Sequence, residues 1–305
     1  MFRRRRFQFF RNECERMGHA LVNSPILLVI WGILWCGSAA AQGGHGPVFG
    51  YATPTNSQGE WSFDAGLLGR SSSGGTQLTA RSMIGYGFTP HLTSWITAPA
   101  ILHGASLPAT TMSGGDDFES KLAWRFHHNA KSVGTRLETT AAAAFVVPGP
   151  QPGGGIMGRL KRAPGADVTL VSGLASRSNY FWMGGGYRRF LERAGDRRPD
   201  VLSYSLVYGY RPASWRKEAN SWDWRLFAEM TGERSGTMQV AGSELPNSQA
   251  HQIFLGPSAL GIFHQYAVEA GVQLPVYQAV GPMFPKEHAR FAVNFSYFLF
   301  QTHQH

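Results

Sequence analysis

Apolar and polar residues alternate strictly along many short stretches of this chain. Residues 117–127, DFESKLAWRFH, form one such stretch. Successive side chains of a β-strand point to opposite faces, so this alternation predicts a strand with one apolar face and one charged face. The apolar face carries Phe118, Leu122, Trp124 and Phe126, and the charged face carries Asp117, Glu119, Lys121 and Arg125.

About twelve segments of this kind follow one another, and no segment has the pattern of an amphipathic helix. Each is close to the ~10 residues that a tilted strand needs to cross a bilayer. The predicted strands are residues 60–70, 76–88, 92–101, 116–128, 134–147, 166–176, 178–190, 200–211, 221–231, 249–257, 262–276 and 288–300.

Other predicted strands repeat the two-faced pattern. Trp222, Trp224 and Leu226 share one face, and with Phe118, Leu122, Trp124 and Phe126 they are predicted to face lipid. The opposite faces are predicted to line a pore. Besides the four charged residues of 117–127, these are Arg136, Glu138, Asp223, Arg225, Glu229, Gln265, Glu269 and Gln273. Acidic and basic residues nearly balance, so strong ion selectivity is not expected, and ion pairing across the lumen stays open beside an open channel.

A soluble β-sandwich could alternate in the same way, but its polar faces would carry more charge. Only 15% of residues are charged, against about 25% in soluble domains. The predicted connections alternate between long and short, as in outer-membrane barrels. Aromatic residues near strand ends suit the girdles of such a barrel, namely Trp61, Trp95, Trp124, Tyr180, Trp182, Tyr210, Trp222 and Trp224. We predict an all-β fold, a transmembrane antiparallel up-and-down β-barrel.

The N-terminus has the plan of a secretory signal peptide. Basic residues precede the apolar run 24–42, which ends in small residues, with Ala39 and Ala41 at the −3 and −1 positions of a cleavage site. The alternative is a permanent anchor, for which the apolar run is short. Translation could start at Met1 or Met17. Both cysteines, Cys14 and Cys36, lie in this leader, so the mature chain has no thiol.

The chain therefore divides into a signal peptide (1–41), a turn-rich periplasmic segment (42–59), the barrel (60–300) and a short polar tail (301–305). Without the leader only a modest positive excess remains, so a nucleic-acid partner is not indicated. The last strand alternates and ends on Leu299 and Phe300. This resembles the C-terminal signature that the outer-membrane assembly machinery recognises, except that QTHQH follows.

The start of the mature chain resembles a known family. Its motifs are Ala52-Thr53-Pro54-Thr55, Gly69-Arg70, and the turn YGFTPHL at residues 86–92. The chain is similar there to the outer-membrane proteins named for the MetA pathway of phenol degradation. Over about the first hundred residues the similarity is clear, and beyond them it is diffuse. The resemblance implies an outer-membrane barrel that passes small molecules, aromatic or apolar ones among them.

Other chemistry finds little support in the residues. His127 and His128 are adjacent on a predicted strand and so point to opposite faces, which is poor geometry for one metal ion. No G-x-S-x-G motif is present, and no Ser, His and carboxylate set stands at strand spacing. We expect no enzyme activity, no cofactor and no bound metal.

The function that these observations predict is passive passage of small solutes across the outer membrane. The expected partners are outer-membrane lipid, the assembly machinery and a small-molecule solute. A non-transporting surface barrel is the main alternative, and a barrel lipid hydrolase or a copper-resistance barrel is a weaker one. The sequence leaves the oligomeric state open.

Overall fold

The structure is a computed structural model that describes residues 46–105, 117–150, 159–215, 221–282 and 284–300. The predicted signal peptide (1–41) with its cleavage residues Ala39 and Ala41, residues 42–45, and the tail 301–305 lie outside the described residues. In the part of the chain that the structure describes, no helix has the length and hydropathy needed to cross a membrane.

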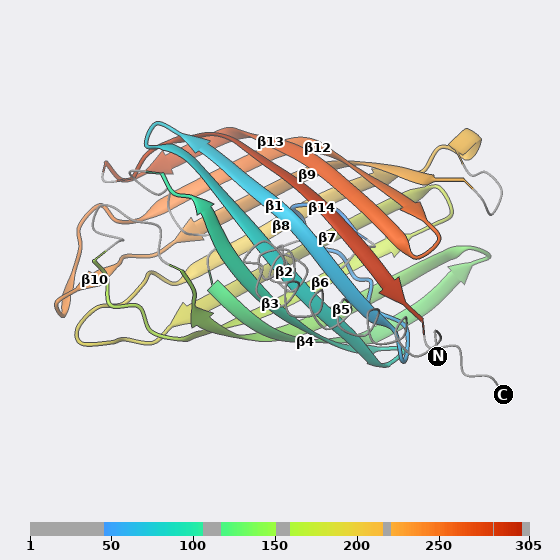
Figure 1. Ribbon diagram of the computed structural model, residues 1–305, viewed down its shortest axis with the longest axis horizontal. Helices are drawn as coiled ribbons and strands as arrows, with labels where there is room; N and C mark the ends of the chain where they lie inside the picture. The colour runs from blue at the N-terminus through green and yellow to red at the C-terminus, as the bar shows by residue number, and fades with distance from the viewer. Residues whose placement is uncertain (1–45, 106–116, 151–158, 216–220, 283, 301–305) are drawn as a thin grey trace, which may run out of the picture. The chain divides into compact units, whose positions relative to one another are not determined.

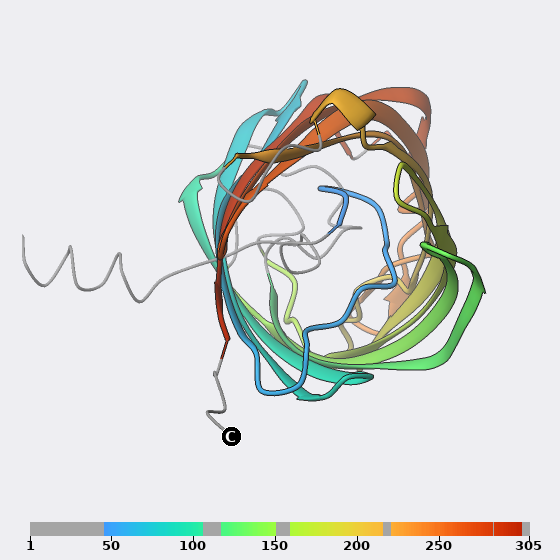
Figure 2. The same ribbon diagram turned by 90° about the vertical axis from the view of Figure 1, so that its right-hand side faces the viewer.

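Twelve antiparallel strands close into a barrel, as the sequence pattern predicted (Figures 1 and 2). Each strand pairs with its sequence neighbours, and β14 pairs with β1 to complete the ring. Closure leaves no strand edge unpaired. The ring strands are β1 (Trp61–Ser72), β2 (Gly75–Thr89), β3 (Leu92–His103), β4 (Asp117–Ser132), β5 (Thr135–Pro148), β6 (Gly165–Ala175), β7 (Asn179–Phe190), β8 (Val201–Tyr210), β9 (Asp223–Ser235), β12 (Ala250–Phe263), β13 (Tyr266–Val280) and β14 (Glu287–Leu299).

The predicted strand bounds match these closely, with one clear difference. The tenth strand was predicted to end at residue 257, but β12 continues to Phe263, and only His264 and Gln265 join it to β13. The prediction placed the connection after Pro257 and began the next strand at residue 262, whereas β13 begins at Tyr266. In the barrel Pro257 instead pairs with Ala228 of β9, and the actual turn uses His264 in a left-handed conformation, with φ of 53°.

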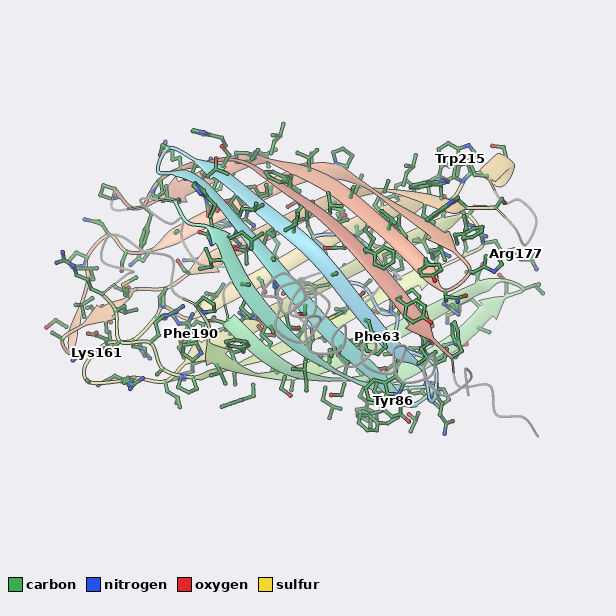
Figure 3. All side chains as sticks on the ribbon, viewed as in Figure 1. Phe63, Tyr86, Lys161, Arg177, Phe190 and Trp215 are labelled. Atoms are coloured by element: carbon green, nitrogen blue, oxygen red, sulfur yellow. The ribbon has the colours of Figure 1, made fainter. Side chains whose placement is uncertain are left out.

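The two ends of the barrel differ in their connections (Figure 3). Tight turns dominate the end near Arg177 and Trp215, where the short helix η1 (Ala213–Trp215) lies in a longer connection. The end near Lys161 and Phe190 carries the long connections, one of which contains the two-stranded sheet of β10 (Gln239–Val240) and β11 (Ser243–Glu244). The alternation of long and short connections was therefore predicted correctly except at η1 and at the tight turn between β1 and β2.

Long connections at this second end pack against one another. Leu160, Met238 and Phe284, from three different connections, form a small buried apolar cluster. The Asp196 carboxylate accepts hydrogen bonds from the backbone N–H groups of Ala241 and Lys161, both at 2.9 Å. These two donors hold the pKa of Asp196 below its usual value. The connections thus form an ordered cap.

Most large apolar side chains point outward from the strands, and polar side chains gather on the inner face. Three predicted girdle residues depart from this rule. Trp95, Tyr180 and Trp182 point into the barrel and are buried, with exposed fractions of 7%, 8% and 2%. The prediction placed them by their position near strand ends, which does not say to which face a side chain points.

Candidate functional site in the lumen

The N-terminal segment, residues 46–59, runs along the inner wall of the barrel (Figure 2). It was predicted as a periplasmic lead-in, and its position inside the ring differs from that expectation. Because it crosses several strands without joining the sheet, its backbone groups need partners from the wall. Side chains of β3, β5, β8 and β9 supply many of them. We call residues 46–59 the lumen segment.

Glu229 on β9 holds the lumen segment at its N-terminal part. Its carboxylate accepts hydrogen bonds from three consecutive backbone N–H groups, those of Val48 at 2.9 Å, Phe49 at 2.8 Å and Gly50 at 2.6 Å. The Ser258 hydroxyl donates a fourth bond. Glu229 is fully buried and has no ion pair among the described residues. Backbone donors and one hydroxyl therefore satisfy this carboxylate.

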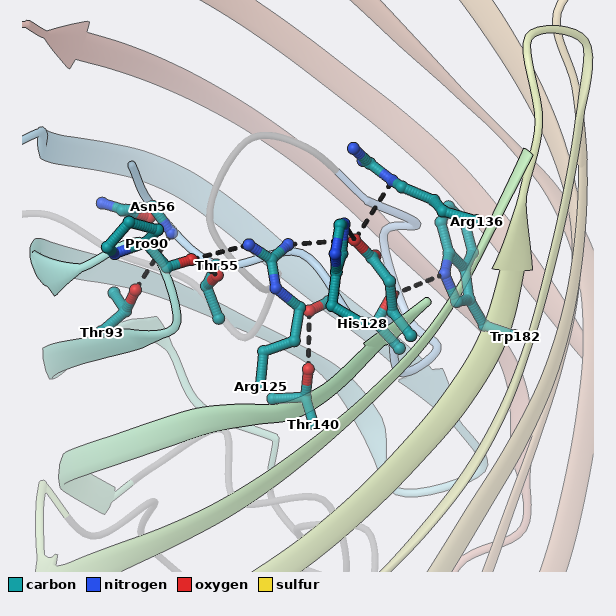
Figure 4. A network of polar contacts seen from close by, with 11 residues as sticks. Thr55, Asn56, Pro90, Thr93, Arg125, His128, Arg136, Thr140 and Trp182 are labelled. Carbon is teal, nitrogen blue, oxygen red and sulfur yellow. Dashed lines mark hydrogen bonds and ion pairs between the residues drawn. The ribbon is translucent and has the colours of Figure 1, made fainter. Parts of the chain in front are cut away.

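Glu138 on β5 holds the segment further along. Its partners from the barrel wall, Arg125, His128 and Arg136, lie close together (Figure 4). The Thr53 hydroxyl donates to its Oε2 at 3.0 Å. Arg125 and Arg136 each place a guanidinium nitrogen 3.1 Å from its Oε1, and His128 Nε2 lies 3.6 Å from the same oxygen. Glu138 is 1% exposed.

A β-bulge allows Arg125 and His128 to reach the same carboxylate. The pairing of β4 with β5 shifts register between Trp124 and His127. Residues an odd number apart on a regular strand point to opposite faces, and the extra residue of a bulge reverses this relation. Strict alternation from Asp117 therefore could not predict the contribution of His128.

Between these two anchors the segment is bonded by hydroxyl groups and an indole. Tyr51 donates its backbone N–H to Ser205 at 2.9 Å, and its phenol lies 2.6 Å from the Ser203 hydroxyl. Trp182 donates its indole N–H to the Thr53 hydroxyl at 3.1 Å. Trp182 and Tyr180 also belong to a buried apolar cluster that includes Ala52 of the segment. The segment is thus packed as well as hydrogen-bonded.

Ion pairs fill the inner wall on the side of the long connections. Arg188 pairs with Glu119 at 2.7 Å and Asp167 at 3.0 Å. Arg198 lies 2.7 Å from Asp117 and stacks over Phe190 at 3.6 Å.

Arg290 on β14 is bonded in a similar way to two acidic residues. Arg290 bonds Glu233 at 2.7 Å and Glu287 at 2.8 Å, and it stacks over Phe254 at 3.7 Å. Pairing of lumen charges, which the sequence left open, is therefore extensive.

A cavity of about 180 Å³ remains between the lumen segment and these ion pairs. Tyr51, Trp95 and Met83 supply aromatic and apolar walls, and Lys121 and Ser203 supply polar groups. One buried water needs about 10–15 Å³ of such volume, so the cavity has room for several waters or one small molecule.

The predicted pore-lining residues all lie on the inner face or at its rim. Asp117, Glu138, Glu229, Glu269 and Gln273 are buried. Glu119, Lys121, Arg125, Asp223, Arg225 and Gln265 are partly buried, and Arg136 is exposed at the rim beside Glu138. The structure brings Arg125, Arg136 and Glu138 together, and it joins Arg225 to Asp223 at 3.1 Å. Whether these residues line an open pore stays a prediction.

The residues predicted to face lipid are all exposed on the outside of the ring, with exposed fractions between 38% and 58%. They are Phe118, Leu122, Trp124, Phe126, Trp222, Trp224 and Leu226.

Several lumen residues were not predicted as such, among them Arg188, Arg198, Glu233, Arg290 and the whole lumen segment. For Arg188 a signal existed, because it has the same parity on its strand as Tyr180 and Trp182. Those aromatics were assigned to the outer girdle, so the signal was read in the wrong direction. No group of three or more His, Cys, Asp or Glu among the described residues could hold a metal ion.

No protein-family model matches the chain. No curated protein matches it either. Among solved structures, the COG4313 outer membrane channel from Pseudomonas putida F1 matches with a TM-score of 0.58 and 11% identity, over 81% of this chain and 97% of that chain. The chain has the fold of an outer-membrane β-barrel.

Two porins match less well. The NanC porin gives a TM-score of 0.47 at 8% identity, over 78% of this chain and 98% of its own. The KdgM porin gives 0.40 at 10% identity, over 79% and 99%. Identities this low show the fold alone, and the resemblance to the family named for the MetA pathway stays a prediction.

Proposed function

We propose that the protein is an outer-membrane channel through which small molecules pass passively, and that the lumen segment narrows its pore. The observation that carries this proposal is a closed ring with an apolar outer face around a polar lumen that contains a cavity of about 180 Å³. An apolar outer band suits lipid, and a polar interior suits passage of solutes. The fold shared with a solved outer-membrane channel supports the same proposal.

The proposal includes the route to the membrane. The leader directs export and is cleaved after Ala41, and the last strand is recognised by the assembly machinery. Phe118, Leu122, Trp124, Phe126, Trp222, Trp224 and Leu226 then contact lipid, and the inner-face charges contact the solute path. Ion pairs and the lumen segment occupy much of the lumen, so we expect a small conductance.

The experiment is single-channel conductance of the mature protein refolded into a planar bilayer. Stable, reproducible small steps are expected from the wild type. The variant Gly50→Val should displace the lumen segment, because a Cβ on Gly50 would collide with the Val207 side chain. Its steps should be larger than those of the wild type.

Silence from both proteins, shown to be folded and inserted, would exclude passage through the lumen. The non-transporting surface barrel would then replace the channel.

Contact of the outer face with lipid is tested separately by Leu122→Arg. Leu122 is 49% exposed on the outer wall, and an Arg near the bilayer midplane costs about 2–4 kcal/mol. We expect this variant to insert poorly into vesicles. Val133→Arg is the matched control, because Val133 is 89% exposed in the turn between β4 and β5. Equal insertion of the two variants would contradict the lipid assignment.

A further inference from the structure

We propose that the lumen cavity binds a small aromatic monoanion, with the Lys121 ammonium as the group that binds its charge. The inference names a solute class for the lumen and so rests on the proposed channel. Benzoate is the simplest compound of this class.

The size and walls of the cavity suit one substituted ring. Its volume is about 180 Å³, and apolar cavities of about 150 Å³ bind benzene. Tyr51 and Trp95 present aromatic groups to it, and Met83 and Val171 add apolar surface. A flat aromatic ring gains from such walls by offset or edge-to-face contacts.

Among the described residues, one cation that lines the cavity has no acidic partner. Of the acids that line it, Glu119 and Asp167 both bond Arg188, and Glu233 bonds Arg290. Lys121 makes no hydrogen bond or ion pair with any residue that the structure describes. The other two lining cations are Arg188, which bonds two of these acids, and Arg81, which has an interaction of its own.

A partly buried ammonium gains most from an anion. Lys121 is only partly exposed, so water solvates it incompletely, and an ionised partner makes a charge-assisted hydrogen bond to it. A neutral ring would leave the ammonium as it is, and a cationic ring would be repelled. The Ser205 hydroxyl, which accepts the Tyr51 backbone N–H, lies on the same cavity and can donate its proton to the second oxygen of a carboxylate. The cavity therefore distinguishes anions from neutral and cationic rings of the same size.

The lumen segment forms one wall of this cavity through residues 49–52. A bound ring would therefore touch both the segment and the barrel.

The test is isothermal titration calorimetry of the folded protein in detergent micelles, with benzoate as the probe. Benzyl alcohol and benzylamine are the neutral and cationic probes of similar size, and acetate is the anion without a ring. We expect saturable binding of benzoate and weaker binding of the other three.

The variant is Lys121→Gln, which should weaken benzoate binding about ten- to hundredfold, the size expected for one lost charge-assisted hydrogen bond. Lys131→Gln is the matched control, because Lys131 lies exposed on the same strand and does not line the cavity. It should bind benzoate as the wild type does, and Lys121→Arg should restore most of the affinity.

Equal benzoate affinity in Lys121→Gln and wild type would overturn the inference, and so would an absence of saturable binding to folded protein. Conductance is measured apart from binding, so the two proposals can fail separately. A protein that conducts without binding benzoate keeps the channel and loses the solute class. A protein that binds benzoate without conducting keeps the cavity site and loses the channel.

Discussion

Two buried carboxylates hold the same lumen segment in different ways. Glu229 accepts bonds from the backbone of Val48, Phe49 and Gly50 and from the Ser258 hydroxyl, and it has no cation partner among the described residues. Glu138 bonds one segment side chain, Thr53, and otherwise faces cations of the barrel wall. The first carboxylate is thus directed at the segment, and the second mainly at the barrel.

The difference separates two roles that burial alone would confuse. Loss of Glu229 should release the segment and leave the charges of the barrel paired. Loss of Glu138 should leave cations of the barrel unpaired, whether or not the segment moves. A gating effect and a stability effect can therefore be measured in different variants.

The largest effect, a loss of barrel stability, is expected from Glu138→Gln. Arg125, whose side chain is 13% exposed, would keep the Pro90 carbonyl, at 2.6 Å, and would face a neutral amide in place of its ionised partner. Breaking a buried ion pair by removing one partner costs about 3–5 kcal/mol, and partial exposure places this case near the lower limit. Denaturant unfolding in detergent, followed by tryptophan fluorescence, measures the loss.

Glu244→Gln is the control for that variant, because Glu244 is exposed on β11. Arg136→Ala should cost less than about 1 kcal/mol, because the Arg136 side chain is 51% exposed. Unchanged stability in Glu138→Gln would contradict the assignment of this carboxylate to the barrel.

The second-largest effect, a loss of lumen-segment docking, is expected from Glu229→Gln. An amide offers one acceptor oxygen and no charge, so it cannot replace the carboxylate toward three N–H groups and a hydroxyl. Because the amide keeps one acceptor oxygen, we expect segment docking to weaken by about 1.5–3 kcal/mol in total. Limited proteolysis within residues 46–59 and single-channel conductance should both increase, with little change in unfolding of the barrel.

One result would contradict the different roles assigned to Glu229 and Glu138. If Glu229→Gln unfolded the barrel while the segment stayed protected from protease, Glu229 would be a structural residue of the wall.

The smallest effect is expected from Thr53→Val. This change removes the bond from the Thr53 hydroxyl to Glu138 and the bond from the Trp182 indole to that hydroxyl, and it keeps the bond from Thr140 to the Thr53 carbonyl at 2.8 Å. A loss of about 1 kcal/mol in segment docking follows. Hydrogen exchange of the segment amides should accelerate modestly, and conductance should change less than in Glu229→Gln. A larger effect than that of Glu229→Gln would make Thr53 the main anchor.

The strands of the barrel could be predicted from the sequence because their signal is local. In β4, alternation from Asp117 to Arg125 states which side chains share a face, and the ring needs no more information than that. The same signal failed where the period was interrupted, at the bulge before His127, and where a proline lay within a strand, at Pro257.

The lumen segment could not be predicted, because its contacts have no local pattern. The hydrogen bond between Val48 and Glu229 joins residues 181 positions apart, and the bond between Thr53 and Glu138 joins residues 85 positions apart. Residues 46–59 contain no regular apolar period, and their turn-forming residues suited an exposed lead-in equally well. The cavity depends on the same distant contacts, because residues of the lumen segment form one of its walls.

The pairing of β1 with β14 has a consequence for how the chain assembles. β1 directly follows the lumen segment, and its outer partner β14 is the last strand of the ring. Contacts between chain ends form late, because they require the longest loop to close. Before β1 and β14 pair, the interior of the barrel is open along one side. After they pair, it is open only at the two ends of the barrel. We therefore expect the barrel to close around the lumen segment. The segment would then be enclosed during assembly, and it would not enter the barrel after closure.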